Sequence, residues 1–269
     1  MRFDNVKVTV TRKLPKPVEE RLAELFDVTL NEDDIPFTQE QLAEAMGTAQ
    51  IVVPSTSDLI DAKIIARAGD QLRMIAQYGT ETNNIDIRSA VGRGIVVTHT
   101  PGLLTEDVAD TAMTLILAVA RRYVEGRKAI EAKGFSGWSP TWMLGTRLSG
   151  KRLGIIGMGR VGQALARRAK GFGLDVHYHN RNPVNPETEA ELGARYWDTL
   201  DKMIPHIDIL SLNCALTPAT FHLVNTRLLR LMPRHASIIN TAHGELIDEA
   251  ALVRALYDEQ ISGIGLDVY

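Results

Sequence analysis

Residues 153–181 read LGIIGMGRVGQALARRAKGFGLDVHYHNR, and this stretch decides the fold. An apolar run at 153–156 leads directly into three glycines, at positions 157, 159 and 162. A helical pattern follows to about residue 170, and a second apolar run spans 176–179. Strand, glycine turn, helix and strand in this order form a βαβ unit, and such units build parallel sheets.

The spacing of the glycines predicts a turn that binds a dinucleotide. Gly157 permits the tight turn, Gly159 lets the backbone approach a pyrophosphate, and Gly162 lets the helix pack closely on the strand. The helix that begins near Arg160 and Val161 offers free N–H groups and the positive end of its dipole to phosphate. A glycine-rich turn without a ligand is the alternative.

The end of the second strand predicts which dinucleotide binds. NAD sites usually carry an Asp or Glu there, whereas an Arg accommodates the 2′-phosphate of NADP. This chain has Asn180 and Arg181. A neutral Asn does not repel a phosphate, and Arg181 supplies a planar cation that can form two parallel hydrogen bonds. We therefore expect NADP(H) to be preferred over NAD(H), with Arg181 as an ordinary solvated arginine the alternative.

Strands and helices alternate through the rest of the chain. Strands are expected at residues 6–10, 26–30, 51–53, 74–77, 96–98, 207–212, 237–240 and 264–267, with helices at 17–25, 39–46 and 62–68. Thr98-His99-Thr100-Pro101-Gly102 breaks the pattern, so we place a hinge there, between a domain of residues 1–99 and a domain of residues 100–269. The predicted fold class is α/β, with a parallel sheet in each domain.

A helix at residues 105–123 follows the hinge. Thr105 can cap it, Glu106 and Asp107 suit its first turn, and it is apolar nearly all round between Val108 and Val119. A helix without a polar face is buried on several sides. One two-domain chain offers it few partners, so we expect this helix to form the interface of a homodimer.

Composition argues against several other classes of protein. The net charge of -3, with 45% hydrophobic and 23% charged residues, gives no concentrated basic face for nucleic acid or an anionic membrane. The apolar stretch at 112–120 is shorter than the roughly 20 residues that span a bilayer. One cysteine fits a reducing compartment, and no His/Cys spacing suggests a metal site. We expect a cytoplasmic protein without a metal.

Five ordered segments resemble the D-isomer-specific 2-hydroxyacid dehydrogenases. They are TPGLLTEDVADTAMTLILAVARR (100–122), GMGRVG (157–162), LSLNCALTPATFHLVN (210–225), IINTAHGELIDEAALVRAL (238–256) and GLDVY (265–269). In addition, VTRKLPKPVEERLAELFDV (10–28) is similar to the glyoxylate and hydroxypyruvate reductase branch. The resemblance implies a flavodoxin-like substrate domain, then a doubly wound Rossmann domain, and reduction of a small 2-oxo acid such as glyoxylate or hydroxypyruvate.

The resemblance also implies which residues form the site. Those expected to face the cofactor are Thr80, Gly157, Gly159, Arg160, Val161, Gly162, Asn180, Arg181, Cys214, Thr241, Ala242 and Asp267. Asp267 would hold the nicotinamide carboxamide, whereas Cys214 is equally well explained as a small buried hydrophobe. The loop of Gly79, Thr80 and Glu81 would receive the substrate carboxylate.

The chain departs from the family pattern at two internal positions. His243 stands where the family has the Arg that clamps the substrate, and Glu81 stands where it has a second glycine. At about 4 Å and an effective dielectric near 20, Glu81 would repel an anionic substrate by roughly 4 kcal/mol. His243 is the candidate catalytic residue. Unlike an arginine, a histidine is generally only partly charged near neutral pH and cannot donate two parallel hydrogen bonds to one carboxylate.

The family's catalytic Glu and His fall beyond Tyr269 in the pattern, as do the last Rossmann strand and the C-terminal helix. We therefore expect a chain truncated at its C-terminus. Two functions stay open at this point. One is an NAD(P)-dependent oxidoreductase of the family. The other is a degenerate, non-catalytic NADP(H)-binding protein or interaction module, which would bind NADPH without measurable turnover.

Overall fold

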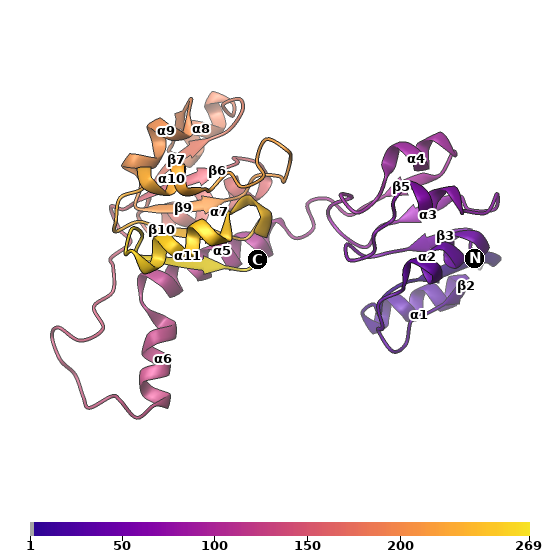
Figure 1. Ribbon diagram of the computed structural model, residues 1–269, viewed down its shortest axis with the longest axis horizontal. Helices are drawn as coiled ribbons and strands as arrows, with labels where there is room; N and C mark the ends of the chain where they lie inside the picture. The colour runs from indigo at the N-terminus through magenta and orange to yellow at the C-terminus, as the bar shows by residue number, and fades with distance from the viewer. Residues whose placement is uncertain (1–2) are drawn as a thin grey trace. The chain divides into compact units, whose positions relative to one another are not determined.

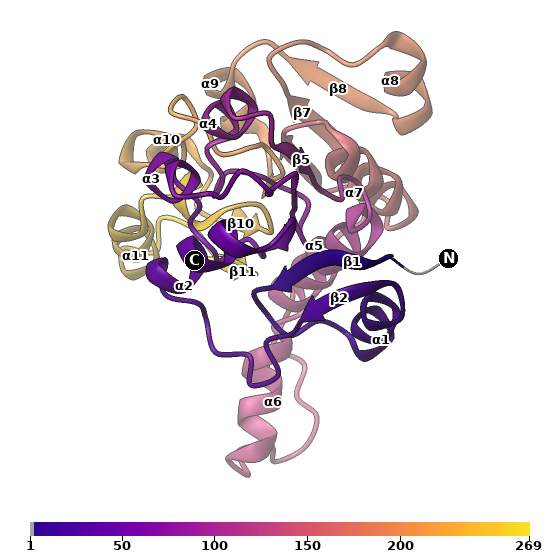
Figure 2. The same cartoon turned by 90° about the vertical axis from the view of Figure 1, so that its right-hand side faces the viewer.

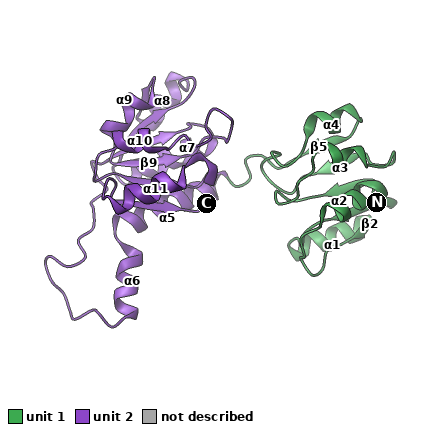
Figure 3. Cartoon of the chain, in the orientation of Figure 1, with its two compact units in different colours: residues 1–104 green, residues 105–269 purple. Residues whose placement is uncertain are grey.

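The computed structural model describes residues 3–269, which form two compact units (Figure 3). One unit runs up to Leu104 and the other from Thr105 to Tyr269. Each is an α/β unit with a parallel sheet, so the predicted fold class is confirmed. Figure 1 labels the elements of both units.

The first unit has a five-stranded parallel sheet in the order β2-β1-β3-β4-β5, which is the flavodoxin-like order. Its strands are β1 (Phe3–Val10), β2 (Phe26–Thr29), β3 (Ile51–Val53), β4 (Met74–Ala76) and β5 (Val96–Thr98). Its helices are α1 (Lys16–Leu25), α2 (Gln39–Thr48), α3 (Ala62–Ala66) and α4 (Ile87–Gly92). Polar side chains start three of these helices: Thr38 forms a capping box with Gln41, and Asp61 and Asp86 accept backbone N–H groups.

The second unit has a six-stranded parallel sheet in the order β11-β10-β9-β6-β7-β8. Its strands are β6 (Arg152–Ile156), β7 (Asp175–His179), β8 (Ala194–Trp197), β9 (Ile209–Leu212), β10 (Ser237–Asn240) and β11 (Gly263–Leu266). Its α-helices are α5 (Thr105–Ala120), α6 (Tyr123–Glu131), α7 (Arg160–Gly171), α8 (Pro186–Leu192), α9 (Leu200–Met203), α10 (Thr226–Leu231) and α11 (Glu249–Tyr257). Two 3-10 helices, η1 (Ile204–His206) and η2 (Gly244–Leu246), complete the unit.

Helices cover both faces of this sheet. Adjacent residues of β10, Ile238 and Ile239, belong to different hydrophobic clusters because side chains alternate along a strand. Residues of α5 and α7 join one cluster, whereas residues of α10 and α11 join the other. All residues of β9 and β10 are buried, which explains why central parallel strands read as continuous apolar runs.

The helix expected at 105–123 is shorter and more polar than predicted. α5 ends at Ala120, and Arg122 adopts a left-handed conformation (φ 54°) before α6 begins. Asp110 and Glu106 form ion pairs with Arg168 of α7, so the first half of α5 has a polar side. In the second half, Leu115, Leu117 and Val119 are half-exposed around the buried Ile116.

The segment of residues 121–147, called the arm here, extends away from the sheet of the second unit in both views (Figure 1, Figure 2). It contains α6 and the long connection to β6. Several of its large apolar side chains are exposed: Tyr123, Val124, Ile130, Phe135, Trp138, Trp142 and Leu144. Within residues 3–269, no helix combines the length and apolarity needed to cross a membrane, and no cluster of three His, Cys, Asp or Glu side chains offers a metal site.

Candidate functional site

The carboxyl ends of the strands of the second unit carry most of the predicted cofactor residues. Because the sheet is parallel, these ends meet at one edge. Gly157 follows β6, Asn180 and Arg181 follow β7, and Cys214 lies two residues after β9. Thr241 and Ala242 follow β10, and Asp267 follows β11. The strand order reverses between β6 and β9, and in open α/β sheets ligands bind at this switch point.

The glycine turn follows β6 at the switch point. Gly157 has φ 95°, and a Cβ there would lie 2.6 Å from the carbonyl oxygen of Asn213 at the end of β9. A Cβ on Gly162 would collide with the carbonyl oxygen of Gly157. Packing within the chain therefore explains both glycines. Gly159 differs, because a Cβ there meets nothing within 4 Å and its φ is -79°. Packing within the chain does not explain Gly159, and the open space there leaves room for a ligand beside the backbone.

Polar groups around the turn are available to a ligand. Three side-chain atoms of residues 3–269 are buried without a hydrogen-bond partner, and two of them, Thr241 Oγ1 and Asn213 Oδ1, belong to the second unit. No side chain caps α7, which leaves the first N–H groups of the helix for an anion. The exposed side chains of Arg160 and Arg181 form no hydrogen bond or ion pair with the described residues. These features fit a dinucleotide, with the arginines available for its phosphates.

Asn240, which sequence reasoning missed, organises the adjacent turn. Its side chain is fully buried; Nδ2 donates to the carbonyl of His243 at 2.7 Å, and Oδ1 accepts the N–H of Ala242 at 3.0 Å. Its own carbonyl accepts the N–H of Asp267 at 2.9 Å. One side chain and its backbone thus fix both Ala242–His243 and Asp267. The signal in the sequence was an amide ending the apolar strand SIIN.

Two further predicted residues have distinct surroundings. Burial raises the pKa of the Cys214 thiol to about 11, so it is protonated at neutral pH and is not a nucleophile. His243 is half-buried and directly precedes η2. In η2, a Cβ on Gly244 would lie 2.5 Å from the backbone of Tyr269, so this glycine permits close packing of the two segments.

The loop of Gly79, Thr80 and Glu81 belongs to the first unit, where it follows β4. The carbonyl of Gly79 accepts hydrogen bonds from the N–H and the hydroxyl of Thr100, at 2.9 and 3.0 Å. The carbonyl of Thr80 accepts a hydrogen bond from Nδ1 of His99 at 3.0 Å. Both carbonyls of the loop therefore face the segment that continues β5. Glu81 is half-buried and accepts a hydrogen bond from Asn83.

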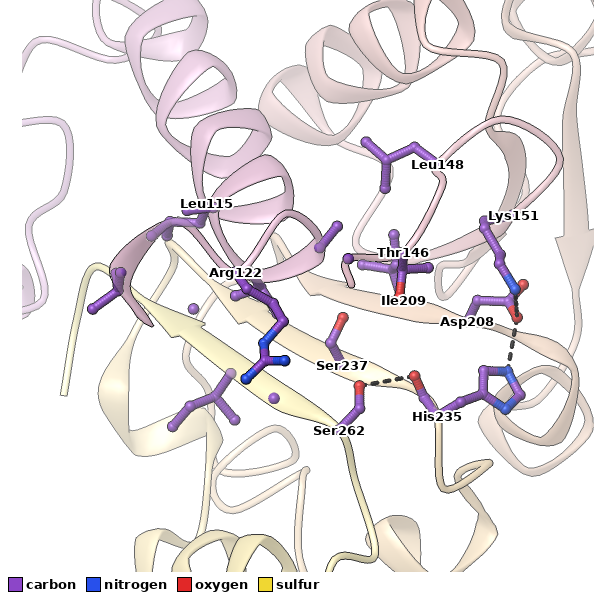
Figure 4. Close-up of a pocket in the computed structure, with 18 of the residues that line it drawn as sticks. Leu115, Arg122, Thr146, Leu148, Lys151, Asp208, Ile209, His235, Ser237 and Ser262 are labelled. Carbon is purple, nitrogen blue, oxygen red and sulfur yellow. Dashed lines mark hydrogen bonds and ion pairs between the residues drawn. The ribbon is translucent and has the colours of Figure 1, made fainter. Parts of the chain in front are cut away.

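A cavity of about 620 Å³ lies along β11 and the second half of α5 and reaches the amino-terminal ends of β9 and β10 (Figure 4). Asp208 on its wall accepts the N–H of Arg152 and bonds the ring of His235, both at 2.8 Å, and lies 3.7 Å from Lys151. Burial alone would raise the pKa of Asp208, but its hydrogen bonds outweigh burial and the pKa is lowered. The lining includes no predicted site residue. The charged cluster around Asp208 instead links the amino-terminal ends of β6, β9 and β10.

Comparison with known proteins identifies the family. Residues 113–269 match the NAD binding domain of the D-isomer specific 2-hydroxyacid dehydrogenases. The chain is 40% identical to glyoxylate reductase of Thermococcus litoralis over 267 residues, which cover 98% of this chain and 80% of that protein. A D-isomer specific 2-hydroxyacid dehydrogenase of Polaromonas sp. has a TM-score of 0.93 at 34% identity, covering 98% of this chain and 82% of that one.

A further solved structure was determined with a cofactor. An acyclic imino acid reductase in complex with NADPH and D-Arg has a TM-score of 0.85 at 27% identity, covering 98% of this chain and 82% of that one. The chain described here belongs to the D-isomer specific 2-hydroxyacid dehydrogenase family. It is an oxidoreductase of that type, and its second unit is a Rossmann domain for a nicotinamide dinucleotide.

The open space at Gly159 makes a specific prediction. Gly159→Ala should fold normally, because the added methyl meets no atom of the chain, yet weaken NADPH binding at least about tenfold by occupying the pyrophosphate position. Calorimetric titration measures the binding, and thermal unfolding checks the fold. Gly171→Ala, at the end of α7 and equally unobstructed, is the matched control. Unchanged NADPH affinity in Gly159→Ala would contradict the assignment of the turn.

Proposed function

We propose that this chain reduces a small 2-oxo acid with NADPH, and that glyoxylate and hydroxypyruvate are the best candidates. The 40% identity to glyoxylate reductase of Thermococcus litoralis carries the substrate class. The glycine turn at the switch point supports the use of a dinucleotide. We further propose that residues 1–99 form the substrate domain and residues 100–269 the cofactor domain. The single cysteine supports a cytoplasmic location.

We propose the following roles for the predicted site residues. The N–H groups at the start of α7 bind the pyrophosphate, and Thr241 Oγ1 and Asn213 Oδ1 hydrogen-bond the bound cofactor. Asp267, positioned by Asn240, holds the carboxamide of the nicotinamide. When bound, NADPH supplies the hydride that the reaction needs. The N–H groups of the Gly79–Glu81 loop orient the substrate carboxylate, because the loop's carbonyls at 79 and 80 are bonded on the other side.

The negative charge that develops on the keto oxygen needs a hydrogen-bond donor. His243 occupies the position of the family's arginine and can donate one hydrogen bond from its ring. A protonated ring offers one shared charge, whereas an arginine offers a fixed charge and two parallel donors. Glu81 adds a negative charge next to the proposed carboxylate position. We therefore propose that both residues slow the reaction: His243 because it lacks the fixed positive charge of an arginine, and Glu81 because its negative charge repels the substrate carboxylate.

Cofactor preference follows from the end of β7. Arg181→Ala should weaken NADPH binding about tenfold or more and leave NADH binding unchanged, because only NADPH has the 2′-phosphate. Fluorescence titration of both cofactors measures the effect. Arg230→Ala, which removes an exposed arginine of α10, is the control. Equal affinities of the unmodified chain for NADPH and NADH would refute the preference.

Turnover is tested by the loss of NADPH absorbance with millimolar glyoxylate or hydroxypyruvate. We expect slow consumption by the unmodified chain. The variant Glu81→Gly/His243→Arg should raise kcat/KM roughly 100-fold, the typical value of one preorganised donor, with NADPH affinity unchanged. Consumption by neither protein would contradict the proposed reaction and favour binding without turnover. If the double variant is active but no faster than the parent, this would contradict the proposed effect of Glu81 and His243 but not the proposed reaction.

We also propose a homodimer formed through the predicted helix, residues 105–123, together with the arm. Trp138 of the arm is 86% exposed and Trp142 packs on Phe135, with ring centroids 5.4 Å apart, at the surface. The second half of α5 has half-exposed Leu115 and Leu117 beside this segment. Contiguous exposed apolar surface of this kind is typical of protein interfaces.

Light scattering at micromolar concentration tests the dimer. The unmodified chain should have twice the monomer mass, and Trp138→Ser/Trp142→Ser should shift it toward the monomer, because these side chains become buried only in the assembly. Tyr257→Ser, which changes an 84% exposed residue of α11, should leave the mass unchanged. A monomeric mass for the unmodified chain would argue against the interface.

A further inference from the structure

A buried carboxyl group joins two loops at the carboxyl edge of the first sheet. Asp58 is 3% exposed, and its Oδ2 accepts hydrogen bonds from Thr11 Oγ1 at 2.6 Å, from the N–H of Ser55 at 2.8 Å and from Ser55 Oγ at 3.2 Å. Thr11 follows β1 and is fully buried, whereas Ser55 and Asp58 lie in the loop after β3. One oxygen atom therefore ties the end of β1 to the loop of residues 54–58.

Asn84 continues this connection toward β4. Its Nδ2 donates to the carbonyls of Ser55 at 3.0 Å and Asp58 at 2.7 Å, and its Oδ1 accepts Nε2 of Gln77 at 2.9 Å. Gln77 is 2% exposed and lies immediately after β4, two residues before Gly79. The hydrogen bonds thus run from the end of β1, through the loop 54–58, to the base of the Gly79–Glu81 loop.

The two loops also touch directly. The N–H of Tyr78 donates to the carbonyl of Pro54 at 2.8 Å, and a Cβ on Gly79 would lie 2.7 Å from Cγ2 of Thr56. Gly79 therefore lets the exposed side chain of Thr56 approach closely, whereas its own backbone angles do not require a glycine. The backbone hydrogen bond from Tyr78 to Pro54 couples the two loops at the same place. On the far side, Thr100 and His99 hold the carbonyls of Gly79 and Thr80.

Stability alone gives little reason for such an arrangement. A buried carboxyl group loses its hydration, and apolar residues of similar volume usually stabilise such a position equally well or better. Gln77 Oε1 is buried without a hydrogen-bond partner, but the bonds among Thr11, Ser55, Asp58, Asn84 and Gln77 Nε2 still link the two loops in one geometry. A loop that orients a small substrate needs this precision, because a displacement of about 1 Å can cost roughly 100-fold in rate.

We propose that Asp58 and Asn84 are positioning residues for the 2-oxo acid, which fix the Gly79–Glu81 loop through the hydrogen bonds from Thr11 to Gln77. This inference rests on the proposed function, which assigns the substrate carboxylate to that loop. Neither residue contacts the substrate in this account. Both act through the backbone of the loops 54–58 and 79–81.

A matched pair of substitutions at Thr11 tests the inference. Thr11→Val keeps the shape of the buried side chain and removes the hydroxyl that Asp58 accepts, whereas Thr11→Ser keeps that hydroxyl. Asn84→Asp is the second variant, because it keeps the shape of Asn84 and removes the Nδ2 donor. The probe is oxamate, a non-reducible analogue of a small 2-oxo acid, titrated calorimetrically with saturating NADP⁺.

Thr11→Val and Asn84→Asp should weaken oxamate binding about tenfold, while Thr11→Ser binds oxamate as the parent does. Hydrogen exchange should accelerate in peptides covering 54–60 and 78–86, which contain the bonded N–H groups of Ser55 and Tyr78, but not in α2. NADP⁺ affinity should change less than oxamate affinity, because all the proposed cofactor residues except Thr80 lie in the other unit. A general loss of folding would instead alter the exchange of α2 as well.

Three results would overturn the inference. They are unchanged exchange in both loops in both variants, faster exchange with unchanged oxamate affinity, and no binding of oxamate to the parent chain. Failure of the proposed function is recognised separately. It would appear as absent NADPH consumption by the parent, while weaker oxamate binding by Thr11→Val would still support the positioning role.

Discussion

The close approach of two backbones at the reversal of the strand order is the constraint on which the second unit depends. Gly157 turns sharply after β6, with φ 95°, and lies against the peptide that joins Asn213 and Cys214 at the end of β9. No side chain fits between these segments. The same turn leads to Gly159, which directly precedes α7. In the first turn of that helix, Gly162 packs on the carbonyl of Gly157. The sheet, the helix and the uncapped N–H groups at the start of α7 are thus placed by one contact.

Elements with strong local patterns could be predicted from the sequence. The bounds of β3, β5 and β10 agree with the expected runs at 51–53, 96–98 and 237–240, because these short runs are rich in the β-branched residues that favour strands. The end of α5 could not be predicted in the same way. Arg121 and Arg122 are compatible with a continuing helix, and the left-handed backbone of Arg122 has no signature in a non-glycine residue. The short strand β8 and the six-residue α4 lack enough periodicity to be recognised.

Gly157 and Arg181 could be proposed from the glycine turn and the end of the following strand, whereas Thr241 and Asp267 were proposed from the family resemblance. In the folded chain all four follow strands of one parallel sheet, at the same edge. Asn240 was missed, although its amide at the end of an apolar strand was visible in the sequence. Asp58 is separated from Thr11 by 47 positions, and such hydrogen bonds between loops leave no local pattern. Only the folded chain reveals which polar residues act together.

The central claim is that a dinucleotide lies over the glycine turn with its pyrophosphate at the start of α7. A crystal structure of this chain grown with NADPH tests the claim most directly. We predict electron density for the pyrophosphate next to Gly159 and Arg160, with the 2′-phosphate beside Arg181 and the nicotinamide toward Thr241 and Asp267. Density for the dinucleotide at another place on the chain, or an empty glycine turn in crystals saturated with NADPH, would contradict the account.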